Sequence, residues 1–563
     1  MPITTTAVRP SVHARRCGVM MGALMGSTLW GNVAMSADQP PTGPIYSVEG
    51  RSMSEVETDL AAGRISSAAL VRLYLARIQA IDRSGPTLRA VLAINPDALA
   101  EAQASDARRA AGRSGTGRAG AVLPLEGIPV LIKDNIETRD PMPTTAGSLA
   151  LAGNLTRRDA PLVARLRAAG AVILGKTNLS EWANMRGDRS ISGWSGVGGL
   201  TRNAFALDRS ACGSSSGSGV AIAASLASAA IGTETDGSVT CPASLSGLVG
   251  LKPTVGLVSR THIIPISSSQ DTAGPMTRTV ADAARLLQVI AGSDPADPAT
   301  LAADAHRTDY LAALDAGSLK GKRIGVMRFA AGYHPEVDTL FDQALEVLRL
   351  SGATLVEIPA FPALDAIGTD EQTVLLTELK TGLNAYLAGT PVTGQPATLA
   401  ALIAFNQAHH DRELGLFGQE LFLKAEATKG LDDPAYLTAR ANARRLAGPE
   451  GIDRLLATDH LDALVAPTGA PAWLIDTIDG DHDMGSASTL PAVAGYPHLT
   501  VPMGLVSGLP VGLSFVGPAW SEARLLGFGY AFEQASPVTL RPQYHSTLET
   551  DPTVQALLRP AER

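Results

Sequence analysis

Apolar residues recur every three or four positions between residues 53 and 82, MSEVETDLAAGRISSAALVRLYLARIQAID, and this spacing predicts amphipathic helices. Residues 160–178 follow a second pattern, in which a helix ends at Gly170 and a short apolar strand follows. The same order recurs around Gly352. Because helices that alternate with short apolar strands are typical of α/β layers, the pattern predicts an α/β fold.

The rest of the chain continues this pattern without a break. Residues 279–292 begin with Thr279 and Asp282 at capping-box spacing, which predicts another helix. No Pro- or Ser-rich linker divides the chain, so we expect a single domain over residues 38–563. The remaining segments are interpreted as a strand at 123–135, a helix of small residues at 220–231, a polar loop at 232–244, a mainly helical insertion around 365–457, and strands with turns at 498–517.

Residues 1–37 have the pattern of a secretory signal peptide. Arg9, Arg15 and Arg16 precede the apolar run 17–35, and small residues follow in AMSA. We therefore expect cleavage after Ser36 or Ala37 and an exported protein, periplasmic or secreted. The alternative is a disordered N-terminal extension on a cytoplasmic enzyme. No later segment is long and apolar enough to span a bilayer, so no stable membrane insertion is expected.

Composition narrows the class of protein. The chain has 563 residues, 45% of them hydrophobic, and a formal net charge of -8, which describes a globular protein with a sizeable core. Without a basic face, a nucleic acid is not expected as a partner, and we expect a monomer. Cys17, Cys212 and Cys241 have no metal-ligand spacing, and the acidic stretch 479–485 lacks a full calcium-loop pattern. No metal or organic cofactor is therefore expected.

The polar loops of the chain favour serine chemistry without a histidine. CGSSSGSG (212–219) and GTETDGSVT (232–240) contain serines, but neither contains a histidine, and the sequence around Ser238 is not the G-x-S-x-G of α/β-hydrolases. A buried lysine has a lowered pKa and can act as the base instead. Lys133 follows three apolar residues of a predicted strand, and its neighbour Asp134 should face the opposite side. Lys252 is the rival base, although its Lys-Pro-Thr turn is more typical of a structural role.

Five segments together resemble the amidase signature family, in the family's order and over most of residues 50–535. They are GIPVLIKDN, CGSSSGSG, GTETDGSVTCPASLSGLVGLKPTVGLVS, DTAGPMTRTVADAA and AGYPHLTVPMG with GLPVGLSFVG. The resemblance implies a mixed β-sheet covered by helices on both faces, with a helical insertion. It also implies a catalytic triad of Ser238, Ser214 and Lys133, a cis peptide bond between Gly213 and Ser214, and a bond from Ser215 to the lysine.

The same resemblance implies an oxyanion hole formed by backbone N–H groups, those of Thr235, Asp236, Gly237 and Ser238. Many family members have glycine where Asp236 stands, and its carboxylate must turn away from an oxyanion, since like charges repel. Asn184 and Arg186 are expected to contact substrate, although their segment could equally be a connector. Cys212 and Cys241 flank the two serine loops and could form a disulfide or remain buried free thiols.

Within the family, TETDGS after CGSSSGSG, together with an export signal, resembles members that remove the C-terminal amide of peptides. The expected reaction is attack by Ser238 on a small peptide amide, with proton transfer through Ser214 to a neutral Lys133 and release of ammonia. An aryl or fatty acid amidase and the family's transamidosome subunit are alternatives within the family. A periplasmic solute-binding protein is the alternative outside it, because such proteins are also exported α/β proteins.

Overall fold

A computed structural model describes residues 46–114, 122–538, 540–550, 555 and 558. The signal peptide predicted for residues 1–37 lies outside this part of the chain. Val48–Arg563 forms one compact unit, and the description below concerns that unit. Within the described residues, no helix is both long enough and apolar enough to cross a membrane.

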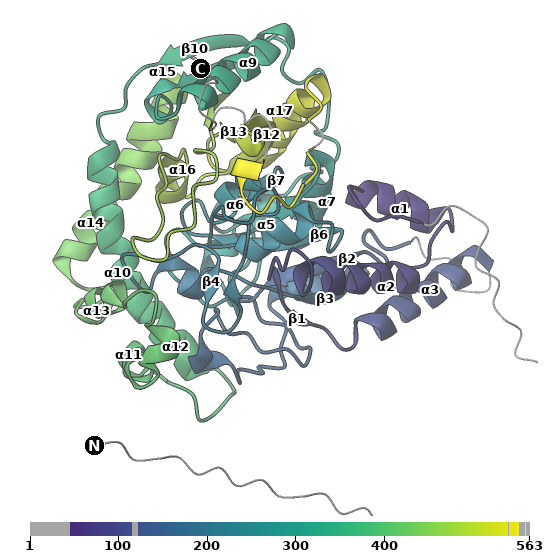
Figure 1. The fold of residues 1–563 in the computed structure, drawn as a ribbon. Coiled ribbons are helices and arrows are strands. Elements are labelled where there is room, and N and C mark those ends of the chain that lie inside the picture. Colours follow the sequence, from purple (N-terminus) through teal and green to yellow (C-terminus); the bar gives the residue numbers. More distant parts are fainter. Residues whose placement is uncertain (1–45, 115–121, 539, 551–554, 556–557, 559–563) are drawn as a thin grey trace, which may run out of the picture. The chain divides into compact units, whose positions relative to one another are not determined.

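A mixed β-sheet runs through the unit (Figure 1). Its eleven described strands lie in the order β1-β3-β2-β6-β8-β7-β12-β13-β11-β9-β10. Strand β2 is parallel to both β3 and β6, and β9 is parallel to both β10 and β11, whereas the remaining neighbours are antiparallel. The strands are β1 (Val91–Ile94), β2 (Pro129–Lys133), β3 (Val172–Thr177), β6 (Ala229–Glu234), β7 (Val249–Lys252), β8 (Thr272–Thr277), β9 (Arg323–Met327), β10 (Thr354–Ile358), β11 (Ala463–Pro467), β12 (His498–Val506) and β13 (Leu509–Val516); β4 (Trp194–Ser195) and β5 (Gly199–Leu200) form a separate hairpin.

Helices cover both faces of the sheet, which confirms the predicted fold class. Helices α5 (Ser216–Ala223) and α6 (Thr240–Leu245) pack on one face of the central strands, and α7 (Val280–Ile290) and α17 (Glu522–Ala535) pack on the other. Since both faces are covered, the central strands β2, β3, β6, β7 and β8 are buried along their whole length. The other helices before and after the insertion are α1 (Met53–Ala61), α2 (Ser67–Arg77), α3 (Ala98–Ser114), α4 (Pro161–Ala168), α8 (Ala303–His306), α9 (Pro335–Leu350) and α16 (Thr489–Ala494).

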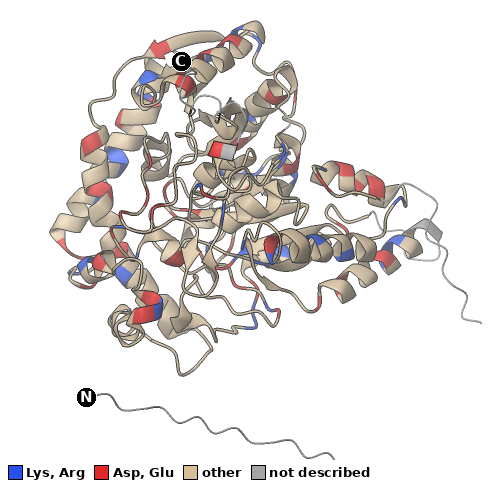
Figure 2. Cartoon of the chain, viewed as in Figure 1, with Lys and Arg blue, Asp and Glu red and all other residues tan. Residues whose placement is uncertain are grey.

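The segment predicted to be helical, around 365–457, falls on six α-helices, with the π-helix η6 (Gly448–Asp453) between the last two (Figure 1). They are α10 (Leu364–Gly389), α11 (Leu399–Ala408), α12 (His410–Glu413), α13 (Glu420–Glu426), α14 (Pro434–Ala447) and α15 (Arg454–Thr458). Leu379, Leu383 and Phe422 of this segment share an apolar cluster with Trp182. Acidic and basic residues are interspersed along several helices, including α2, α3 and α14 (Figure 2).

Two local predictions are corrected around the serine loops. Residues 220–231 do not form one helix, because α5 ends at Ala223, Ser225 has a positive φ of 55°, and β6 begins at Ala229. Residues 232–244 are not one loop either, since Gly232 to Glu234 extend β6 and α6 begins at Thr240. A Cβ on Gly232 would lie 2.7 Å from Ser215 Oγ, so only a residue this small lets α5 pack so closely on the strand. The small side chains of β6, rather than a high content of aliphatic residues, are therefore the sequence feature that reflects its burial.

Candidate active site

Strand β2 ends at Lys133, whose side chain is fully buried and lies against one of the serines. Its Nζ is 2.7 Å from Ser214 Oγ, 2.9 Å from Thr233 Oγ1 and 3.1 Å from the Thr233 carbonyl oxygen. Asn135 Nδ2 also donates to Thr233 Oγ1, at 2.9 Å. The structure thus brings together the predicted base and the predicted relay serine, and Thr233 fixes the amine.

The surroundings of Lys133 favour a neutral amine. Burial lowers its pKa from the ordinary value of 10.5 to about 7, although the charges of Asp271 and Glu234 act in the opposite direction. Asp134 faces the other side of the strand, where it lies 3.6 Å from Lys176 and bonds to Thr145. The prediction that Asp134 does not hold Lys133 is therefore confirmed. The rate of a reaction that needs this base should depend on pH close to neutrality.

The two serine loops are joined in two places. The backbone N–H of Ser215 donates to the carbonyl oxygen of Ser238 at 3.1 Å. Cys212 and Cys241 form a disulfide, with their Cα atoms 6.0 Å apart, which answers the question that the sequence left open. The peptide bond between Gly213 and Ser214 is cis, as the family resemblance implies. The Ser214 and Ser238 loops are therefore held side by side.

Ser215 has a different partner from the one predicted. Its Oγ donates to the carbonyl oxygen of Thr233 at 3.1 Å, and it accepts from the Thr233 N–H at 3.2 Å. Lys133 Nζ contacts that same carbonyl oxygen, so the serine and the lysine share an acceptor instead of bonding to each other. Ser215 supports the site through the backbone of β6.

The loop 235–239 connects β6 to α6 and carries Ser238, which is 7% exposed. Gly237 has a φ of 74°, a conformation that glycine adopts at little cost. The Glu234 carboxylate accepts from the N–H groups of Val239 and Thr240, at 2.7 and 2.9 Å, and so fixes the start of α6. No acceptor in the described part of the chain takes the N–H groups of the four predicted oxyanion-hole residues, Thr235, Asp236, Gly237 and Ser238. These donors are available to an anion.

The carboxylate of Asp236 is engaged by other side chains. Thr489 Oγ1 donates to its Oδ2 at 2.8 Å, and Glu371 of α10 lies at hydrogen-bond distance. The positive charge of Lys252 also stabilises the ionised form of Asp236. The backbone N–H of Asp236 can therefore donate to an oxyanion, while groups outside the loop stabilise its side-chain carboxylate.

Arg186 does not lie where a substrate contact requires it. Its side chain is fully buried, 3.0 Å from Glu181 and 3.6 Å from Glu413, and its guanidinium lies 4.0 Å from the centre of the Phe417 ring. These contacts join the segment before the serine loops to the helical segment. The geometry gives Arg186 a structural role and speaks against the predicted contact with substrate.

Asn184 lies closer to the serine loops. It lines an open cavity of about 440 Å³ together with Asp188, Asp479 and Asp481. Its Nδ2 donates to Ser192 Oγ at 3.2 Å, and a Cβ on Gly213 would lie 3.1 Å from that same hydroxyl. Ser192 therefore links Asn184 to the loop that carries Ser214, and Asn184 stays a candidate for substrate contact.

A second cavity, of about 320 Å³, approaches the site from the side of Lys133. Asn135, Thr233, Thr235 and Asp271 line its polar end, and residues 263–266 form an apolar wall. Thr235 Oγ1 donates to Asp271 at 2.6 Å. Solvent can thus approach the residues that fix Lys133 and the start of the 235–239 loop.

The rival base is placed differently. Lys252 ends β7, fully buried, and its Nζ donates to the carbonyl oxygen of Pro253 at 3.3 Å. Burial lowers its pKa to about 8. Among the hydrogen bonds of the described residues, Lys252 has none to Ser214 or Ser238, which leaves Lys133 as the base in contact with a serine.

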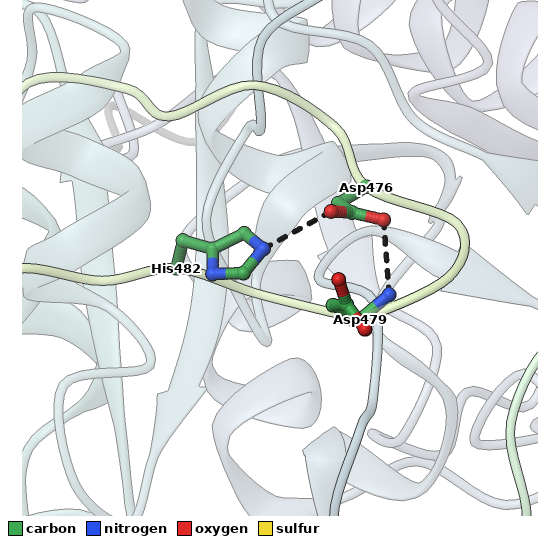
Figure 3. Close-up of side chains that lie close together, drawn as sticks. All are labelled: Asp476, Asp479 and His482. Atoms are coloured by element: carbon green, nitrogen blue, oxygen red, sulfur yellow. Dashed lines mark hydrogen bonds and ion pairs between the residues drawn. The ribbon is translucent and has the colours of Figure 1, made fainter.

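The acidic stretch after residue 475 contains a small cluster of potential ligands, shown in Figure 3. Asp476 accepts from the N–H groups of Ile478 and Asp479, at 2.8 and 2.9 Å, and lies 3.1 Å from His482 Nε2. These contacts lower the pKa of Asp476 to about 2. They organise an exposed loop, in line with the interpretation of this stretch as solvated.

Sequence reasoning missed several residues that shape the site. Thr233 and Asn135 lie within the quoted motifs, five positions before Ser238 and two after Lys133, so their polar side chains next to the triad were the available signal. Glu234 could have been recognised as a cap for the helix that follows. Glu371 lies in the helical insertion, and no local sequence pattern marks it as part of the site.

Comparison with known proteins identifies the family of the chain. The chain matches the Amidase family model over residues 69–526. It is 39% identical over 518 residues to the "Probable amidase" of Arabidopsis thaliana, which covers 90% of this chain and 94% of the relative. Its structure is similar to that of the peptide amidase PAM in complex with the competitive inhibitor chymostatin, with a TM-score of 0.82 and 55% identity over 87% of this chain and 98% of that one. It is also similar to native peptide amidase from Stenotrophomonas maltophilia, with a TM-score of 0.81 and 54% identity over 88% and 98%. The chain belongs to the amidase signature family and is an amide hydrolase.

Proposed function

We propose that this amidase removes the C-terminal amide of peptides and releases ammonia through an acyl-enzyme on Ser238. The observation that carries the proposal is the contact between the buried amine of Lys133 and Ser214 Oγ, at 2.7 Å, in a loop bonded to the backbone of Ser238. The similarity to peptide amidases supports the choice of substrate.

The first half of the proposed reaction forms the acyl-enzyme. Ser238 Oγ attacks the carboxamide carbon while its proton passes to Ser214, and the Ser214 proton passes to neutral Lys133. The carbonyl oxygen becomes an oxyanion, which accepts hydrogen bonds from the N–H groups of the 235–239 loop. The relay then returns the proton to the leaving nitrogen, the C–N bond breaks, and ammonia departs.

The second half uses the same groups. Water attacks the acyl carbon and gives its proton to the relay, the oxyanion forms again, and Ser238 Oγ leaves with a proton returned from Lys133 through Ser214. The net change is one water consumed for one ammonia and one free carboxyl group. No redox step or co-reactant is needed.

A terminal carboxamide differs from an internal peptide bond because its nitrogen carries no further chain. A closed space beyond the leaving nitrogen would admit the first and clash with the second. On the acyl side, the peptide would extend toward the cavity lined by Asn184, held mainly by its backbone, so side-chain selectivity should be broad. We further propose that residues 1–37 direct export and that the enzyme acts as a monomer on small peptide amides.

Release of ammonia from a panel of amides tests this function. The panel holds N-protected dipeptide amides, longer peptide amides, an aryl amide and a fatty acid amide, each incubated with the wild-type enzyme and with Ser238→Ala. Release from the peptide amides by the wild type alone supports the proposal. Release confined to the aryl or fatty amides would favour the broader amidase, and binding without release would favour a solute-binding protein.

A further inference from the structure

Helix α10 places a carboxyl group against the loop that carries the nucleophile. Glu371 lies in the third turn of that helix and is 7% exposed. Its carboxyl group is at hydrogen-bond distance from that of Asp236, two residues before Ser238. The proposed function uses the N–H of Asp236 but gives Glu371 no role.

The pair has hydrogen-bond donors around it but no bonded cation. Thr489 Oγ1 donates to Asp236 Oδ2 at 2.8 Å, and Gln270 Nε2 donates to Glu371 Oε1 at 2.7 Å. Ser488 also interacts with the Asp236 carboxylate, whereas its buried Oδ1 has no hydrogen-bond partner within the described residues. No ion pair with a lysine or arginine forms at either carboxyl group within the described residues, and Lys252, whose charge acts on Asp236, is bonded to Pro253.

Two buried carboxyl groups in contact resist ionising together, because desolvation and the repulsion of like charges both favour the protonated form of one of them. A single proton between them resolves the conflict and also supplies the donor that Asp236 Oδ1 lacks. Glu371 is the natural carrier, because its Oε1 accepts from Gln270 in the manner of a carbonyl oxygen, which leaves Oε2 free to hold the proton.

We propose that Glu371 is a positioning residue of the oxyanion hole: as a protonated acid it donates to Asp236 and ties helix α10 to the 235–239 loop. Gln270 extends the connection, since its Nε2 also lies 3.4 Å from the carbonyl oxygen of Thr235. The two residues that open the loop are thus held by groups outside it, with their N–H groups left for the oxyanion. This inference rests on the proposed function of that loop.

The connection should weaken in alkali. The charged and titratable groups that face the pair are Lys252 from β7, Glu234 from β6 and Asp483 from the loop before α16. Burial and the Asp236 charge raise the pKa of Glu371 well above its usual range. As pH rises through that raised value, Glu371 loses its proton, two negative charges meet, and kcat falls.

Two substitutions at Glu371 separate the role of its proton from that of its shape. Glu371→Gln keeps a donor for Asp236 and an acceptor for Gln270 but cannot ionise, so its kcat at pH 7 should stay within about threefold of the wild type and its alkaline decline should vanish. Glu371→Leu removes the bond and should lower kcat at least tenfold with little change in KM. Asp370→Asn, at the neighbouring position on α10, removes a carboxyl group that the proposal does not use and should keep the wild-type profile.

A measurement without substrate makes the result independent of the proposed function. Because Glu181 and Glu533 also have raised pKa values, the test is an infrared difference spectrum at pH 7. Wild type minus Glu371→Gln should contain the carbonyl band of a protonated carboxylic acid, and wild type minus Asp370→Asn should contain none. Loss of the band in Glu371→Gln supports a proton on Glu371, even if the Glu371→Leu variant does not fold. An unchanged band in Glu371→Gln, or a Leu variant with wild-type kcat, overturns the proposal. A wild type that shows the band but hydrolyses no amide would reject the proposed function and keep the proton.

Discussion

The amine of Lys133 lies in a site where water cannot stabilise its charge, and its close contacts are hydroxyl and carbonyl groups rather than carboxylates. Burial therefore outweighs the more distant charges of Asp271 and Glu234 and lowers its pKa to about 7. The lowered pKa reflects the free-energy cost of moving a charged amine out of water. A lysine in this position can accept a proton at neutral pH, which an exposed lysine cannot do.

The activity should follow the protonation of this amine. Above about pH 7 Lys133 is neutral and active, and below that value it is protonated, so kcat/KM should fall by about tenfold for each further pH unit. Initial rates between pH 5 and pH 8 measure this, with enzyme returned from pH 5 to pH 8 as the control for unfolding. A rate that stays constant down to pH 5 would rule out Lys133 as the base.

Removal of each triad residue should have a non-additive effect. Ser238→Ala, Ser214→Ala and Lys133→Ala should each lower kcat by about a thousandfold or more, and the double variants should lose little beyond that, because the three groups act as one relay. Melting temperatures serve as the control for folding. Losses that simply multiply in the double variants would show that the residues act independently.

The triad stays a prediction from the family resemblance, and the structure shows the contact between two of its members, Lys133 and Ser214. The residues that contact the active-site loops from distant parts of the chain could not be predicted from sequence. Whether Asp236 turns away from an oxyanion depends on Thr489 and Glu371, which lie far along the chain and meet it only in the folded protein. The contacts of Arg186 could not be predicted for the same reason, since its partners include Glu413 and Phe417.

At the scale of the elements, Arg186 links the η3 turn (Glu181–Asn184) to helix α12. Arg186→Met should lower the free energy of unfolding by about 3–5 kcal/mol, because it leaves Glu181 and Glu413 buried without their cation. KM for a peptide amide should stay close to that of the wild type. Denaturant titration and steady-state kinetics measure the two effects. A large rise in KM at unchanged stability would restore the predicted contact with substrate.

The disulfide between Cys212 and Cys241 closes a sequence separation of 29 residues around both serine loops. In the chain-entropy view, such a link stabilises the fold by about 3–4 kcal/mol. The double variant Cys212→Ser with Cys241→Ser should therefore melt at a lower temperature than the wild type. A reductant should lower the melting temperature of the wild type only, and equal melting temperatures without reductant would contradict this account.

Element boundaries followed the sequence pattern where apolar periodicity was strong. Helix α7 begins after Thr279, whose hydroxyl accepts from the Asp282 N–H at 3.2 Å, as the capping-box spacing predicts. The pattern failed between residues 220 and 244, because β6 is built from small and polar residues that a core strand seldom contains. Close packing against α5 explains that composition, and packing of this kind cannot be inferred from periodicity.

Across the whole unit, the large mixed sheet supplies Lys133 from one strand end and Thr233 from the neighbouring strand, while α10 and α16 contribute contacts to the 235–239 loop. The fold class was predictable because helix and strand patterns alternate along most of the chain. The packing of the helical segment against the loop was not, because it depends on surfaces that form only after folding.

The central claim is that Ser238 attacks the terminal carboxamide of a peptide and no internal bond. Mass spectrometry of an amidated peptide, incubated with purified wild-type enzyme and with Ser238→Ala, tests it most directly. The account predicts a gain of about one mass unit, from NH2 to OH, in the wild-type sample alone, with the peptide otherwise intact. Internal fragments, or an unchanged mass while non-peptide amides are hydrolysed, would contradict it.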